Sequence, residues 1–134
     1  MQLLGLAWSG ADRESLKPLA RAIIANQKAD GGWAQTPYLA GDAYATGQTL
    51  VALKEAGIDP SDPVYRKGVD FLVRTQLPDG SWHVVSRAPK FQPYFQSGFP
   101  HDHDQWISMA ATAWAAMALT SSAGNAASVA SLTH

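Results

Sequence analysis

Apolar and small residues recur at helical spacing in two segments of the chain. They occupy positions 16, 19, 20, 23 and 24 in the first segment, and positions 64, 68, 71, 72 and 75 in the second. Steps of three and four residues predict an amphipathic helix in each. Asp62 and Pro63 give the second helix its expected cap and first residue. Pro18 predicts that the first helix begins near Ser15, because a proline deeper in a helix clashes with the preceding turn.

Two other segments predict helices of a different kind, rich in Ala and Thr. Residues 45–53 align with residues 111–119 at an offset of 66, which pairs Thr46 with Thr112. Residues 3–10 match residues 50–57 at an offset of 47, and both end in glycine, a common helix stop. We therefore expect the chain to begin partway along a third helix of this kind. The chain has no sustained alternation of apolar and polar residues, which is the pattern that predicts a strand.

A seven-residue motif, Q-x-x-D-G-[GS]-W, occurs at residues 27–33 and again 49 positions later at residues 76–82. Each copy follows an amphipathic helix and precedes a small-residue helix, so the chain is an all-α array of helical repeats. In each copy we expect the Gln to hydrogen-bond free amides at the start of a neighbouring helix, and the Trp to pack across that junction after an Asp-Gly turn. Gln27, Trp33, Gln76 and Trp82 are therefore predicted to be structural.

These motifs resemble the QW motifs of squalene-hopene cyclase and its relatives. Residues 112–119 also resemble the inner-barrel helices of that superfamily, which includes the protein prenyltransferase β subunits. The resemblance implies an all-α fold, a partial α/α toroid in which inner and outer helices alternate around a central cavity, with two QW-type repeats. It covers most of a domain at residues 1–121, and residues 122–134, rich in Ser and Ala, are expected to form a disordered tail.

Composition and charge exclude several other classes of function. Ten Lys and Arg against eleven Asp and Glu leave no basic face for nucleic acid or an anionic membrane. The absence of cysteine excludes disulfides, thiol nucleophiles and zinc-cysteine sites. No stretch approaches the length of a membrane helix, and the N-terminal residues lack the positive start of a signal peptide. We expect a soluble protein, and nothing indicates its compartment.

The two repeats differ in length between the Trp and the following helix. Trp33 precedes Thr46 by 13 residues, whereas Trp82 precedes Thr112 by 30, so the second repeat carries an insertion at about residues 86–104. A proline-stiffened aromatic loop before an inner helix is expected at the mouth of the cavity, where ligand contacts are common. Aromatic faces there would stabilise a carbocation. The candidate ligand contacts are Tyr44, Gln48, Tyr94, Phe95, Phe99, Trp106 and Trp114.

Three interpretations of the cluster at residues 101–104 stay open. Asp102 or Asp104 caps the helix that begins near Gln105, with His101 and His103 solvated. Alternatively, His101, His103 and Asp104, with His83, bind a divalent metal such as zinc or manganese; no other cofactor is expected. In the third interpretation, Asp104 or Asp102 is a general acid in an aromatic cavity.

The resemblance implies chemistry that this sequence matches only in part. Squalene-hopene cyclases protonate a double bond with an aspartate of a D-x-D-D motif, and residues 102–105 lack its final aspartate. Protein prenyltransferases use an Asp, Cys and His zinc site, which a chain without cysteine lacks. We expect a repeat domain that binds an apolar, isoprenoid-like ligand. Any enzymatic activity is expected to be that of a squalene or terpene cyclase-like isomerase or lyase with Asp104 as acid.

The alternative is a non-catalytic helical-repeat interaction module. Two repeats do not close a toroid, which takes about six helical pairs in the family, so an apolar flank is left to be covered. The expected partners are the rest of a longer chain, another domain, or further copies in a homo-oligomer. Asp42 is expected to be the N-cap of the helix that follows it, with a polar, cavity-facing role as the alternative.

Overall fold

The computed structural model describes residues 5–6, 9–10, 12–36, 38–85, 98–101 and 104–132, with the backbone alone at Arg13 and beyond residue 121. Its helices are α2 (Arg13–Ala25), α3 (Ala43–Glu55), α4 (Pro63–Thr75) and α5 (Gln105–Leu132), and residues 5–6 are helical as well. Within these described ranges there is no strand, and one isolated bridge joins Trp33 to Asp42. The predicted all-α fold is confirmed.

Aspartate side chains cap the starts of α2, α3 and α4. Asp42 accepts a hydrogen bond from the Ala45 amide at 2.7 Å, and Asp62 accepts one from the Val64 amide at 2.9 Å. The predicted starts at Asp42 and Asp62 are thus confirmed. The first helix begins at Arg13, two residues before the predicted start near Ser15, because Asp12 caps it.

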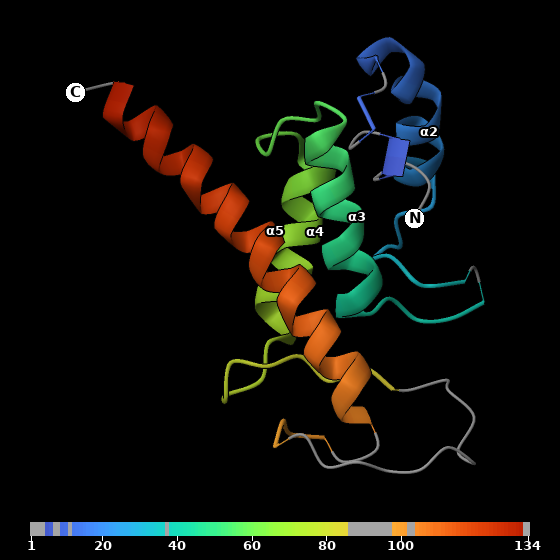
Figure 1. The fold of residues 1–134 in the computed structure, drawn as a ribbon, viewed down its shortest axis with the longest axis vertical. Helices are drawn as coiled ribbons and strands as arrows, with labels where there is room; N and C mark the ends of the chain where they lie inside the picture. The colour runs from blue at the N-terminus through green and yellow to red at the C-terminus, as the bar shows by residue number, and fades with distance from the viewer. Residues whose placement is uncertain are drawn as a thin grey trace.

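The two small-residue helices, α3 and α5, pack directly against each other, and Figure 1 shows them side by side. A methyl group on Gly47 of α3 would lie 2.7 Å from the Ala115 nitrogen, so only glycine permits this approach. On α5, Ala111, Ala115 and Ala118 are fully buried. At the other end of the contact, Lys54 Nζ donates to the Ser121 carbonyl at 3.1 Å. These are the predicted inner helices, and the amphipathic α2 and α4 are the outer ones.

The end of the chain continues the last helix. Helix α5 continues through residues 122–132, and in Figure 1 its C-terminal part runs away from the other helices. The segment contains four alanines and no proline. Because alanine has the highest helix propensity and nothing interrupts the backbone hydrogen bonds, the helix extends past its contact with α3.

Candidate functional site

The first Q-x-x-D-G-x-W turn joins α2 to its neighbours. Gln27 Nε2 donates hydrogen bonds to the carbonyls of Gly31 and Val64, both at 2.9 Å, and the second of these lies in the first turn of α4. Trp33 is buried and its Nε1 donates to the Ile23 carbonyl of α2 at 2.8 Å. The acceptors of Gln27 are carbonyls and not the free amides predicted, because a glutamine amide donates as readily as it accepts.

Trp33 also fills the space between α3 and α4. A methyl group on Gly68 would lie 3.0 Å from the Trp33 ring and 2.8 Å from Leu50 Cδ2. The glycine therefore lets α4 approach the indole closely. One side chain thus holds three helices together, as the predicted structural role requires.

The second turn repeats the local geometry of the first. Gln76 Nε2 donates to the Gly80 carbonyl at 2.9 Å, and Trp82 Nε1 donates to the Leu72 carbonyl at 2.9 Å. The Trp82 amide donates to Thr112 Oγ1 at 3.1 Å, as the Trp33 amide donates to Thr46 Oγ1 at 2.9 Å. This shared contact shows that the alignment of Thr46 with Thr112 is structural.

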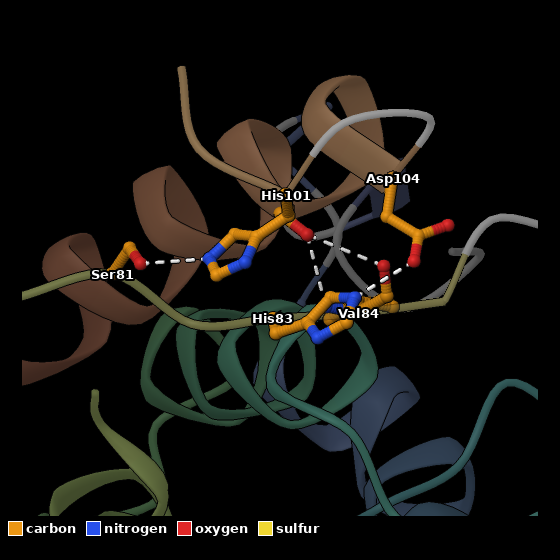
Figure 2. Close-up of polar contacts among 6 residues, drawn as sticks. Ser81, His83, Val84, His101 and Asp104 are labelled. Atoms are coloured by element: carbon orange, nitrogen blue, oxygen red, sulfur yellow. Dashed lines mark hydrogen bonds and ion pairs between the residues drawn. The ribbon is translucent and has the colours of Figure 1, made fainter.

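A polar cluster lies beside the second turn, where the insertion meets α5 (Figure 2). His83 Nε2 lies 2.7 Å from Asp104 Oδ2, and the rings of His83 and His101 stack in parallel with centroids 4.5 Å apart. His101 Nε2 lies 2.9 Å from Ser81 Oγ, which lies 2.6 Å from Asp79 Oδ1. The hydrogen bonds from the Ser81 hydroxyl and then from its amide hold the pKa of Asp79 below its ordinary value.

An extra turn of α5 creates this arrangement. Helix α3 begins three residues before Thr46, whereas α5 begins seven residues before Thr112. In the added turn, Ser108 Oγ bonds both the amide and the carbonyl of Val84, at 3.0 and 3.2 Å. The segment after Trp82 therefore runs along the start of α5 and carries His83 to Asp104.

The geometry of the cluster bears on the predicted acid and metal ligands. Asp104 Oδ2 is engaged by a ring nitrogen of His83, at a hydrogen-bonding distance of 2.7 Å. His101 has a φ of 84°, a left-handed conformation rare for residues other than glycine, and its ring is engaged by Ser81 and His83. Among the residues that the structure describes, no group of three His, Asp or Glu side chains is arranged to hold a metal.

The predicted ligand contacts that the structure describes lie in a groove beside α3, on α5 and at the end of the insertion. Tyr44 and Gln48 line a groove of about 390 Å³ between α2, the first turn and α3, together with Trp33 and Thr49. A neighbouring hollow of about 590 Å³ shares the wall formed by Asn26, Trp33, Ala34 and Gln35.

Two further candidates lie on α5. Trp114 occupies the position on α5 that corresponds to Gln48 on α3, and it is half-buried against the core. Trp106 is 56% exposed on a different face of α5.

Phe99 lies edge-on to His101, with ring centroids 6.5 Å apart. Four predicted site residues lie outside the described part of the chain: Tyr94, Phe95, Asp102 and His103.

Sequence reasoning missed Ser81 and Ser108 as the residues that fix this cluster. Both are marked by the repeat. Ser81 stands where the first copy has Gly32, and Ser108 stands four residues before Thr112, as Asp42 stands four before Thr46. The available signals were therefore the change from glycine to serine at position 81 and the polar residue that both copies have four positions before the threonine.

Small-residue inner helices that alternate with amphipathic outer helices, joined by Q-x-x-D-G-x-W turns, define the α/α-toroid class. The chain belongs to the squalene-hopene cyclase family, since the family model of the squalene-hopene cyclase C-terminal domain matches residues 2–132. It is 34% identical over 119 residues to a protein of Sinorhizobium fredii (strain NBRC 101917 / NGR234) named as a probable squalene–hopene cyclase. That match covers 85% of this chain and 17% of the relative.

No solved structure matches the chain significantly. None of the helices among the described residues is long and apolar enough to cross a membrane.

Proposed function

We propose that this chain forms part of the wall of an apolar cavity and that the cavity takes an isoprenoid-like ligand. The observation that carries the proposal is the groove beside α3, in which Tyr44 and Gln48 lie one helical turn apart. Cavity walls of this kind combine aromatic and apolar surface with a few polar groups that orient the ligand. The relative's name supplies the ligand class, because squalene is an isoprenoid hydrocarbon.

The faces of α3 support this assignment. Gly47 and Lys54 face α5, and Leu50 faces Trp33 and α4. Tyr44 and Gln48 are half-buried on the remaining side, which neither α4 nor α5 covers. The corresponding side of α5 carries Trp114. The described groove is lined by α2, the first turn and α3, and the proposal extends its wall to α5 through Trp114, the repeat counterpart of Gln48.

Squalene is the probe that tests the binding proposal. Titration of the chain with detergent-dispersed squalene, followed by tryptophan fluorescence, is expected to saturate. Tyr44→Ala is expected to weaken binding about fivefold, equivalent to about 1 kcal/mol for one lost aromatic contact. Val73→Ala, at an exposed apolar position on α4, is the matched control and should bind as the unaltered chain does. A chain without saturable binding, or an equal loss in Val73→Ala, contradicts the proposal.

The same proposal gives Asp104 an anchoring role, because its carboxylate accepts from His83. The competing role, proton donation to an alkene, is separated from it by Asp104→Asn. As an acid, Asp104 is required for isoprenoid turnover while squalene binding and stability stay unchanged in the variant. As an anchor, its replacement loosens the segment at residues 98–101 and leaves any turnover of the chain in place.

A further inference from the structure

The end of the insertion lies against the second turn through two stacked imidazole rings. His101 points from the insertion toward Ser81 (Figure 2). Its ring lies parallel to that of His83, with the centroids 4.5 Å apart and the planes at 1° to each other. His83 follows Trp82 directly in the sequence. The stack therefore joins residues 98–101 to the turn that precedes the insertion.

A carboxylate faces each ring of the stack. His83 Nε2 lies 2.7 Å from Asp104 Oδ2, at the start of α5. His101 reaches Asp79 through Ser81, whose Oγ lies 2.9 Å from His101 Nε2 and 2.6 Å from Asp79 Oδ1. Residues 76–85 and α5 contain no lysine or arginine. Asp79 and Asp104 are therefore the charged groups that these two elements place beside the imidazoles.

The two halves of the cluster sense each other's charge. The hydrogen bonds from the Ser81 hydroxyl and amide are the main causes that lower the pKa of Asp79, and the charge of His101 lowers it further. Because His101 also stacks on His83, which contacts Asp104, a proton gained at one ring changes the electrostatic energy of the whole cluster. Groups this close take up protons in coupled steps.

We propose that the stack is a pH-responsive clasp. It holds residues 98–101 on the second turn while at most one ring is charged, and it releases them when both rings are protonated. One imidazolium is stabilised by the carboxylate beside it. A second imidazolium places like charges 4.5 Å apart, and Asp79 offsets this repulsion only in part because the Ser81 hydroxyl lies between it and His101. The open form therefore binds the second proton more readily than the closed form, so a falling pH favours release.

The backbone of His101 favours the same release. Its φ of 84° lies in the left-handed region, which is unfavourable for a residue with a side chain and persists where the surroundings hold it. The contacts that engage its ring are those with Ser81 and His83. Once they weaken, the backbone is free to return to a common conformation. The clasp is independent of the ligand proposed above, because none of its residues lines the groove beside α3.

Nuclear magnetic resonance of the isotope-labelled chain, with a chelator present, tests the clasp. The nuclear Overhauser contact between the rings at positions 83 and 101 is expected near neutral pH and should be lost as the pH falls toward about 5, through the range in which imidazoles gain charge.

Two variants that remove the same contact between His83 and Asp104 should shift the release in opposite directions. Asp104→Asn takes away a negative charge beside the rings, so release should move to a pH higher by about one unit. His83→Phe leaves an aromatic ring that never becomes charged and that attracts the His101 imidazolium, so the ring contact should persist to a lower pH than in the unaltered chain.

Asp70→Asn is the matched control, because it removes the same charge from an exposed position on α4. It should leave the pH of release unchanged, and circular dichroism verifies that every variant remains helical across the pH range. A ring contact that the unaltered chain keeps in full down to about pH 5 overturns the clasp. So does a shift to higher pH in both Asp104→Asn and His83→Phe, since loss of a purely structural contact would loosen the two alike.

Discussion

The two Q-x-x-D-G-x-W turns have the same backbone conformation but differ in the residues that pack over them. Gly31 and Gly80 have φ angles of 91° and 87°, so the local turn is the same. A methyl group on Gly31 would collide with the Lys67 carbonyl of α4, whereas one on Gly80 would meet only the end of the Gln76 side chain. The motif thus fixes the turn, and the tertiary surroundings decide whether the turn also binds a neighbouring helix.

The residue before each Trp shows how the sequence follows that difference. Gly32 leaves room for the Phe71 ring of α4, to which a methyl group would come within 2.9 Å. Ser81 occupies the same place in the second turn, where its hydroxyl meets His101 of the insertion. In the first turn the residue before the Trp thus packs against an aromatic ring of α4. In the described part of the second turn, the residue at the same position makes a polar contact with the insertion.

The largest expected effect comes from the two buried indoles. Trp82→Ala should lower the free energy of unfolding by about 3–5 kcal/mol, and Trp33→Ala should reach the upper end of that range because Trp33 contacts three helices. Urea unfolding followed by circular dichroism measures both. An unchanged midpoint for Trp82→Ala contradicts its packing role, and a smaller loss for Trp33→Ala than for Trp82→Ala contradicts the comparison.

Exchange of the residue before the Trp should affect the turns unequally. Gly32→Ser adds atoms against the buried Phe71 ring and should cost about 1–3 kcal/mol of stability. Ser81→Ala removes hydrogen bonds without crowding and should cost about 0.5–1.5 kcal/mol. Equal thermal unfolding temperatures for the two variants would contradict this prediction. They would show that α4 shifts to make room for the serine side chain at position 32.

The two glutamines provide a smaller contrast. Gln27 bonds two carbonyls and reaches α4, whereas the exposed Gln76 bonds, among the described residues, its own turn alone. Gln27→Ala should therefore cost about 1–2 kcal/mol, and Gln76→Ala about 0.5 kcal/mol or less. Chemical denaturation of both variants measures the difference, and a costlier Gln76→Ala would reverse the comparison.

The smallest effect is a pH dependence at the second turn. Because the pKa of Asp79 lies below its ordinary value of 3.8 in the fold, the unfolded chain binds its proton first as the pH falls. The stabilising contribution is complete above that ordinary value and is lost as the pH drops through the folded pKa. Asp79→Asn should flatten the dependence of stability on pH in this acidic window, as thermal unfolding at several pH values would show. An unchanged profile would remove Asp79 from the cluster's energetics.

Much of the fold followed from local signals in the sequence. The caps at Asp42 and Asp62, and the equivalence of Thr46 and Thr112, are visible because capping and repeat register depend on near neighbours. The predicted start of α2 near Ser15 lies two residues from the observed one, because Asp12 is the residue that caps the helix.

The candidate site depended more on tertiary structure. The residues of the insertion were visible as a cluster of His and Asp, but their partners were not. Ser81 and His83 contact His101 and Asp104 where Ser108 holds the segment after Trp82 along an added turn of α5. Contacts over twenty or more residues leave no periodic trace in a sequence.

The sequence by itself determined the class of element, the repeat and its register, because helix periodicity, capping and tight turns are set within a few residues. Tertiary structure alone decided which faces are covered. Gly47 and Ala113 occupy equivalent positions on their helices, yet one is buried under α5 and the other is exposed. Their surroundings differ because burial depends on which helix packs beside each face, and that is fixed by the path of the whole chain.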